Sequence, residues 1–349
     1  MDSVTHIALG SAMGMAIMGS RTLRWRSALW GSVCATLPDL DVLIPYGDPV
    51  RDMTFHRAET HALFYLALAA PLIAWVISRI HKEAALFRRW WLATWAVLSG
   101  HALLDLMTTY GTQIALPFTD HPYRVGSIFV IDPLFTLPVL IGALIALCRR
   151  SPRAARWNIA GLLLSVAYLS WTVLAQQHVA RIAHDSLRAQ GIVADRIEVG
   201  PTPFNSILWQ VTAMTPHSYA VGFYSLLDKE PRIAFREHPR GEALFERFRD
   251  NWHVARMAWF TEGVFRMELQ GGFIRITDLR LGLAPFYAFS FAVLRQQGDG
   301  FVPISPKPLG TRPPLDAALP WLWRRLKGEP LAPLQPDGVI RRDPRLSAN

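Results

Sequence analysis

Long runs of apolar residues are the feature that most constrains how this chain folds. A helix needs about 20 apolar residues to cross the hydrocarbon core of a bilayer. Four runs of about that length are 61–80, 90–107, 127–148 and 157–175. Two shorter runs precede them, at 4–20 and at 27–45, and Pro38 interrupts the second. We therefore predict a polytopic bundle of four to six membrane helices, in which the first two runs either span the bilayer or re-enter it.

The composition agrees with a membrane protein and excludes other classes. Of 349 residues, 51% are hydrophobic and only 18% are charged, which is too apolar for an ordinary soluble protein or a disordered one. The net charge of +9 is spread over both halves without a basic block, so the sequence shows no nucleic-acid footprint. The partner that this composition predicts is the lipid bilayer; it gives no oligomeric state.

Arginines and lysines between the apolar runs predict an orientation. Loops with several basic residues alternate with loops that are acidic or nearly neutral, namely 38–60 and 108–126. The basic loop residues are Arg21, Arg24, Arg26, Arg79, Lys82, Arg88, Arg89, Arg149, Arg150, Arg153 and Arg156. Because basic loops stay in the cytoplasm, we expect the N-terminus and everything after residue 176 to lie on the outer face.

The second half of the chain changes character. Short alternating runs bounded by Pro and Gly predict an antiparallel sheet; they are 196–199, 207–213, 218–226, 265–269, 273–279 and 286–294. We also expect helices at 178–190, 241–260 and 315–327, and an otherwise irregular Pro-rich tail beyond about 303. The predicted fold is thus mainly α: a membrane-embedded helical domain over 1–177, then a smaller extracytoplasmic α+β domain over 178–349.

Ionisable side chains lie inside the apolar runs, where a charged group costs several kcal/mol and is a functional hypothesis by default. On the expected topology all of them lie toward the outer face; they are His6, Asp39, Asp41, His56, His61, His101, Asp105 and Asp132. We interpret His56 and Asp132 as structural. His101 and Asp105 are four residues apart, so they share one face of a helix.

The remaining six residues predict a metal site: His6, Asp39, Asp41, His61, His101 and Asp105. Imidazoles with carboxylates suit zinc, with manganese or iron as alternatives. Such an ion with an open position lowers the pKa of its water and produces a nucleophile. Whichever of Asp39 and Asp41 is not a ligand is then the candidate general base.

Two arginines in the same outer loops are candidates for binding a phosphate. Arg57 and Arg124 carry the charge that such a group needs. The competing interpretation makes them solvated loop charges or ion-pair partners of Asp52 or Asp120. For Asp105, the structural alternative is to cap a following element or to pair with Arg57.

Four motifs in order make the first 180 residues resemble the YdjM-type family of bacterial inner-membrane proteins, described as metal-dependent hydrolases. The motifs are Thr5-His6 with Gly10 and Gly14, Pro38-Asp39-Leu40-Asp41, His56-Arg57-x-x-Thr60-His61, and His101-x-x-x-Asp105 with Thr109-Tyr110-Gly111. The resemblance implies a location in the bacterial inner membrane. Pro203-Phe204-Asn205 and Leu208-Trp209 resemble an extension found in a subgroup of that family.

A more distant resemblance is to zinc-dependent phospholipase C. By that similarity, His6 and a bridging Asp105 hold one ion, while Asp39 or Asp41 with His61, His101 and Asp105 hold the other. We therefore expect one or two ions and a membrane-bound hydrolase that cleaves a phosphoester or ester of a lipid or lipid-linked substrate. The alternative is a non-catalytic metal-binding membrane protein that acts in transport, sensing or envelope assembly.

Overall fold

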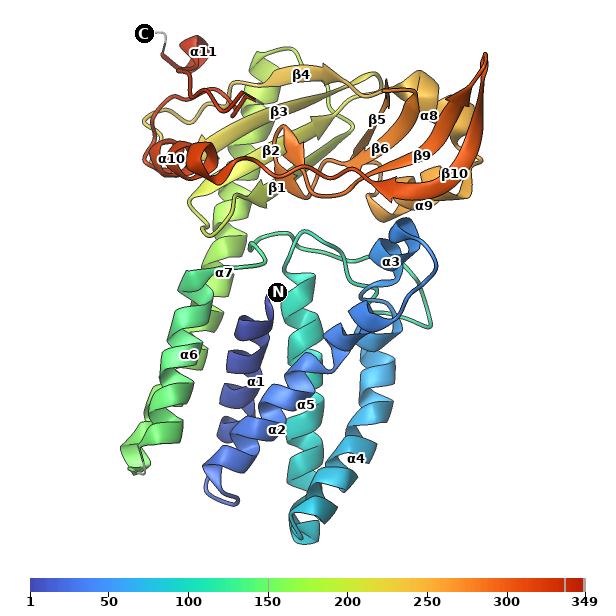
Figure 1. Cartoon of the computed structure of the whole chain (residues 1–349). Coiled ribbons are helices and arrows are strands. Elements are labelled where there is room, and N and C mark those ends of the chain that lie inside the picture. The colour runs from blue at the N-terminus through green and yellow to red at the C-terminus, as the bar shows by residue number, and fades with distance from the viewer. Residues whose placement is uncertain (150, 336, 348–349) are drawn as a thin grey trace. The chain divides into compact units, whose positions relative to one another are not determined.

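The computed structural model describes residues 1–149, 151–335 and 337–347 and divides into two compact units (Figure 1). The first unit comprises residues 1–44 and 55–173, and the second comprises residues 45–54 and 174–349. Residues 45–54, which the sequence analysis assigned to the membrane domain, thus group with the second half of the chain.

The first unit is built from helices. They are α1 (Ser3–Met18), α2 (Arg24–Thr36), η1 (Pro38–Leu43), η2 (Glu59–His61), α4 (Leu63–Ile80), η3 (Ala84–Leu86), α5 (Phe87–Leu106), α6 (Pro133–Cys148) and the first part of α7 (Pro152–Ala189). The short helix α3 (Pro49–Phe55) lies almost wholly in the second unit. Within the described residues, two helices, α4 and α7, are long and apolar enough to cross a membrane, whereas α1 and α6 are apolar but have 16 residues each. A bundle of four to six spans therefore stays a prediction.

Small residues let the helices of the first unit pack closely. A Cβ atom at Gly10 would lie 2.2 Å from the carbonyl oxygen of Gly31, so α1 and α2 touch backbone to backbone. The same holds for α6 and α7, because a Cβ atom at Gly161 would lie 2.3 Å from the carbonyl oxygen of Pro138. Such contacts are typical of helix packing in membranes. They give Gly10 a structural reason to belong to the first motif.

Asp132 has a structural part, as the sequence analysis expected. It is the N-cap of α6, where its carboxylate accepts from the backbone N–H of Leu134 at 3.0 Å and from the Tyr168 hydroxyl at 2.8 Å. Pro133 occupies the first helical turn. These residues explain why the helix begins at 133, six residues later than the predicted run.

The second unit consists of antiparallel sheets. One has the order β1-β2-β3-β4, a second has the order β10-β9-β6-β5, and β7 pairs with β8. The strands are β1 (Arg196–Pro201), β2 (Leu208–Met214), β3 (Ser218–Ser225), β4 (Arg236–Pro239), β5 (Phe265–Gln270), β6 (Phe273–Asp278), β7 (Gly282–Leu283), β8 (Phe286–Tyr287), β9 (Ser290–Gln297) and β10 (Gly300–Pro308). The helices are α8 (Glu242–Phe248), α9 (Trp252–Phe260), α10 (Leu315–Leu326) and α11 (Pro344–Ser347).

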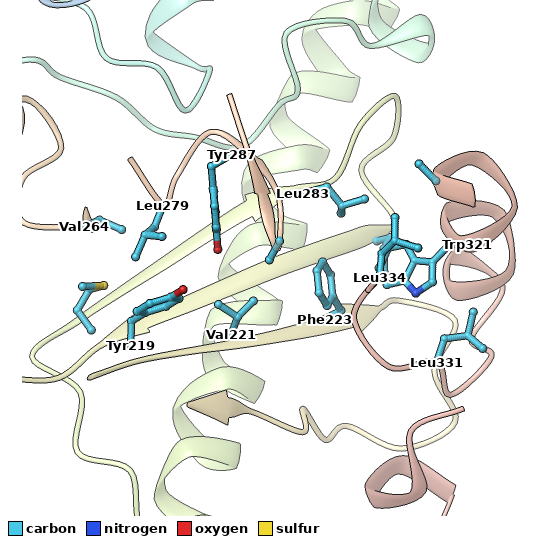
Figure 2. Packing of buried hydrophobic residues seen from close by; sticks show 14 residues of the cluster. Tyr219, Val221, Phe223, Val264, Leu279, Leu283, Tyr287, Trp321, Leu331 and Leu334 are labelled. Carbon is cyan, nitrogen blue, oxygen red and sulfur yellow. The ribbon is translucent and has the colours of Figure 1, made fainter. Parts of the chain in front are cut away.

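Both faces of the first sheet are buried. Trp209 and Val211 of β2 pack with Val179 and Ala183 of α7 on one face. On the other face, Tyr219, Val221 and Phe223 of β3 join a cluster that includes Trp321 of α10 (Figure 2). The amphipathic stretch at 178–190 is therefore the continuation of α7 rather than a separate helix, and its apolar stripe covers the sheet.

Several predicted boundaries in this unit were wrong. The helix expected over 241–260 is two helices, because Asn251 caps a new start by accepting from the backbone N–H of His253 at 3.0 Å. The edge strands β4 and β10 were missed. The latter holds Pro303 and Pro308, and proline is tolerated in a sheet mainly at an edge. The chain therefore stays in a regular strand until residue 308, beyond the predicted limit of 303.

Candidate metal centre

Four side chains from three elements converge in the first unit. They are Asp39 of η1, His61 of η2, and His101 and Asp105 of α5. One potential ligand atom from each lies within 4.8 Å of the others. All four belong to the set predicted from the sequence. The three from η2 and α5 are fully buried, whereas the Asp39 side chain is 25% exposed.

The spacing of these atoms matches a small tetrahedral ion. The Nε2 atoms of His61 and His101 are 3.1 Å apart, and each lies 3.3 Å from Asp105 Oδ2. Asp39 Oδ1 lies 3.4 Å from His61 Nε2 and 3.5 Å from His101 Nε2. Zinc ligands at about 2.0–2.1 Å from a tetrahedral ion are about 3.3 Å from one another. The donor set and its distances therefore fit one divalent ion.

Hydrogen bonds at the far side of each imidazole fix which nitrogen faces the centre. His101 Nδ1 lies 2.6 Å from the carbonyl oxygen of Ala35 and must donate to it, which leaves Nε2 as the lone-pair nitrogen of the neutral ring. Metal-binding histidines are oriented in this way, by a bond from the other ring nitrogen. No sequence pattern could have identified Ala35, because every residue has a backbone carbonyl.

His61 is oriented by a relay of side chains. Its Nδ1 lies 2.9 Å from Thr60 Oγ1, and that hydroxyl donates to Asp41 Oδ2 at 2.8 Å. Since the threonine proton points to the carboxylate, the oxygen is left to accept from His61 Nδ1. Both histidines thus present an unprotonated Nε2 to the same space.

Asp41 lies behind the centre rather than among the four converging groups. Besides Thr60, its carboxylate is bonded to His56 Nδ1 at 2.7 Å and to the backbone N–H of Arg57 at 3.0 Å. It is buried and lies 3.8 Å from His61 Nδ1, the nitrogen that faces away from the centre. His56 is thus joined to the site by Asp41, and Asp41 orients His61 through Thr60.

Arg57 is buried. It is therefore not the accessible loop residue that was expected to bind a phosphate. Its Nη2 lies 3.1 Å from Asp105 Oδ1, its Nη1 donates to Thr108 Oγ1 at 3.0 Å, and its guanidinium lies over the Tyr110 ring. This is the Asp105 pairing that the sequence analysis kept as the alternative. Arg124 is half-buried between α5 and α6, and its substrate-binding role stays a prediction.

His6 borders the centre from α1. Its ring stacks on His101 with centroids 3.7 Å apart, and its Nε2 lies 3.3 Å from Asp105 Oδ1 and 3.9 Å from Asp39 Oδ2. The amino nitrogen of Met1 also contacts Asp105 Oδ1. The second ion of the phospholipase pattern would need this oxygen as a bridge. Arg57 already supplies positive charge beside Asp105 Oδ1, so the arrangement favours one ion.

One buried oxygen tests whether the residues fit a metal. Asp105 Oδ2 is completely buried, and no described residue forms a hydrogen bond to it. A buried carboxylate oxygen without a partner costs several kcal/mol. It faces two imidazole lone pairs and the Asp39 carboxylate, which are acceptors as well. A cation between these four groups resolves the conflict.

Comparison with known proteins places the first half of the chain in context. The YdjM inner membrane protein family matches residues 1–179. The inner membrane protein YbcI of Escherichia coli is 34% identical over 123 residues, which cover 34% of this chain and 69% of that protein. The uncharacterized protein YfhP of Bacillus subtilis is 22% identical over 228 residues, or 64% of this chain and 68% of that protein. No solved structure matches.

Proposed function

The chain belongs to the YdjM inner membrane protein family, and from that premise we propose that it is a membrane-bound, metal-dependent hydrolase. Its substrate would be an ester or phosphoester of a lipid or lipid-linked molecule. The observation that carries the proposal is the buried Asp105 Oδ2, which has no hydrogen-bond partner in the described part of the chain and lies among three other acceptor groups. When bound, a divalent ion with an open position supplies Lewis acidity and a water-derived nucleophile at neutral pH. Zinc suits the two imidazoles and two carboxylates, and manganese is the alternative.

Each side chain has a distinct part in this proposal. Asp39, His61, His101 and Asp105 would hold the ion. Asp41 keeps His61 in the correct tautomer through Thr60, and Arg57 neutralises the second oxygen of Asp105. The protein thus supplies a fixed ligand set from which water is largely excluded. In such a site, electrostatic interactions with the charge that develops in the transition state are stronger than in water.

A proton acceptor is the remaining requirement. Asp41, which the sequence analysis considered for this role, already receives bonds from His56, Thr60 and the backbone of Arg57. His6 is better suited, because neither of its ring nitrogens has a hydrogen-bond partner among the described residues and its Nε2 faces the carboxylates of the centre. We assign His6 to accept the proton of the attacking water.

The open side of the centre supports a lipid substrate. Of the four converging residues only Asp39 is reached by solvent. The chain around it exposes large apolar side chains: Leu40, Val42, Leu43 and Ile44 are each at least half exposed. An apolar patch of this kind beside a polar site is typical of contact with a lipid chain.

A matched set of variants tests the proposal. Protein loaded with zinc or manganese is mixed with vesicles of phosphatidylglycerol labelled in the headgroup, and release of the label into water is measured; a carboxylic ester lipid is tested in parallel. We expect turnover by wild type and by Asp132→Asn, which alters a buried carboxylate away from the centre. His101→Ala should lose both metal and turnover, whereas His6→Gln should keep the metal and lose at least about 100-fold in rate.

The deep burial of His61, His101 and Asp105 also favours the second candidate, a metal held for structure, sensing or transport. Stoichiometric metal in wild type, without release of label from either class of lipid, would overturn the hydrolase proposal and leave this second candidate. Metal flux into sealed vesicles would identify transport.

A further inference from the structure

The second unit carries an apolar surface that the metal centre does not explain. Three exposed residues of α10 recur every fourth position and so form a stripe along one side of the helix: Leu315, Leu319 and Trp323 are 70%, 51% and 62% exposed. The opposite side of α10 is anchored in the core by Trp321 and Arg325, which are both buried. The stripe is therefore held rigidly outward.

Two turns of the same unit also expose large apolar side chains. Leu227, in the turn after β3, is 55% exposed, and Phe204, in the loop between β1 and β2, is 46% exposed. Phe204 has a left-handed backbone with φ of 67°, a conformation that is strained for a non-glycine residue.

Asn205 holds this strained loop in place. Its Oδ1 accepts from the backbone N–H groups of Ile207 and Leu208 at 2.9 and 2.7 Å, and its Nδ2 donates to the Pro203 carbonyl at 2.9 Å. The Pro203-Phe204-Asn205 motif is thus built to present Phe204 outward. We call Phe204, Leu227, Leu315, Leu319 and Trp323 the apolar rim.

The sheet register brings both turns and the end of α10 to one edge. Pro201 of β1 pairs with Trp209 of β2, and Leu208 pairs with Ser225 of β3. The Ser225 hydroxyl donates to the carbonyl oxygen of Leu326 at 2.5 Å, and Arg325 binds the Asp228 carboxylate at 2.6 and 2.7 Å. The last turn of α10 is therefore fixed to the edge where β1 ends and β2 begins.

Helix α7 shows which edge of the sheet this is. The Gln176 side chain donates to the carbonyl oxygen of Val199 near the end of β1 at 2.9 Å, whereas the Gln190 side chain reaches Ile233 beyond the other end of the helix. The apolar part of α7 that is suited to a bilayer ends near residue 175. The two turns and the last turn of α10 thus lie at the level where the apolar part of α7 ends, and the opposite edge lies about 20 Å further along the helix.

We propose that the apolar rim inserts into the surface of the bilayer that α7 leaves. The occupant is lipid because α7 runs unbroken from the apolar segment into this unit, so the rim is tethered at that surface. The charge pattern fits as well: exposed Lys229 and Lys327 flank Leu227 and Trp323, and they suit anionic headgroups. Insertion of an amphipathic helix to about 5–10 Å is the usual depth for this arrangement.

Nitroxide labels in the full chain test this proposal. In a background of Cys34→Ala and Cys148→Ser, single labels are placed at Leu319→Cys, Trp323→Cys and Val193→Cys, and the protein is embedded in nanodiscs that contain phosphatidylglycerol. Val193 is the matched control, because it is 81% exposed and lies between the end of α7 and the start of β1, at the opposite edge. Power saturation then compares access of oxygen, which concentrates in hydrocarbon, with access of a water-soluble nickel chelate.

We expect the oxygen-to-nickel ratio at 319 and 323 to exceed that at 193 by about tenfold, as for a helix buried in the headgroup boundary. Equal ratios at all three sites would overturn the proposal. So would exclusion of both reagents together with dipolar broadening between labels, which would identify a second copy of the chain as the occupant. A fourth label at Leu227→Cys repeats the measurement without altering α10.

Discussion

Asp105 of the first unit and two carboxylates of the second unit are paired in different ways. In the second unit, Asp278 receives the guanidinium of Arg280 through three contacts of 2.7–3.2 Å, and Asp228 receives that of Arg325 at 2.6 and 2.7 Å. In the first unit, Asp105 receives Arg57 on one oxygen only. Its other oxygen faces lone pairs.

This difference separates a structural ion pair from a binding site. A carboxylate whose two oxygens both receive donors from the protein has no need of a cation. A cluster with more acceptors than donors is incomplete until a cation or protons enter it. Burial alone does not distinguish the two cases, because Asp105, Asp278 and Arg280 are all buried; the count of donors and acceptors does.

The largest effect should follow from removing a converging ligand. A bound ion stabilises the folded chain, and Asp105→Asn replaces one of its four ligands. The variant should therefore abolish metal-dependent stabilisation. We expect the thermal midpoint of wild type in detergent to fall by about 10 °C when a chelator removes an ion present at a thousand times its Kd. Asp105→Asn should show no such shift. An equal shift in wild type and variant would contradict the assignment.

A second test removes a paired carboxylate's partner in the second unit. Arg280→Met leaves Asp278 buried without its partner and should cost about 3–5 kcal/mol in the free energy of unfolding. The double variant Arg280→Met with Asp278→Leu should recover most of this loss. Denaturant unfolding followed by the strand signal in circular dichroism measures both, and metal content should stay unchanged. A double variant as unstable as the single one would show that the pair is more than a satisfied structural contact.

The relay behind His61 should have an intermediate effect. Thr60→Val keeps the side-chain shape but removes the hydroxyl between His61 and Asp41, and outer-shell changes of this kind weaken metal affinity by about 10–100-fold. Competition with a metal-binding dye measures the change. Thr136→Val, which removes a hydroxyl bonded to Thr5 and to the Asp132 carbonyl, is the control and should leave the affinity unaltered. The same affinity in both variants would exclude the relay.

The smallest effect should come from the cap of α6. Asp132→Ala removes an N-cap and should cost about 1 kcal/mol, while Asp132→Asn should cost less because asparagine also caps helices. Thermal unfolding of both variants in the same detergent measures the difference. Loss of metal in either variant would mean that Asp132 belongs to the centre after all.

Much of the candidate site was predictable because its signals are local. The four-residue spacing of His101 and Asp105 places both on one helix face, and polar residues in apolar runs are conspicuous. The distinction between Asp39 and Asp41 was not predictable. It depends on the 3₁₀ turn of η1, which aims Asp39 at the histidines and turns Asp41 toward Thr60 and His56. The pairing of Arg57 with Asp105 depends likewise on contacts between distant segments.

In the second unit, too, features with a local sequence pattern were predictable and the others were not. Strands with alternating apolar residues, such as β2 and β3, were predicted to within about one residue. The edge strands β4 and β10 lack that pattern, because few of their side chains enter the core. The helices of the first unit are the reverse case. Apolar runs predicted where these helices lie, but α6 begins at its Asp132 cap rather than at the start of the run.

The central claim is that the first unit holds one divalent ion. The most direct measurement is the metal content of detergent-purified wild type, His101→Ala and Asp132→Asn by elemental mass spectrometry, before and after reloading with zinc or manganese. We predict about one ion per chain in wild type and Asp132→Asn and none in His101→Ala, with all three folded. No stoichiometric metal in reloaded wild type would contradict the account, and the cluster would then be a network of protonated histidines and carboxylates.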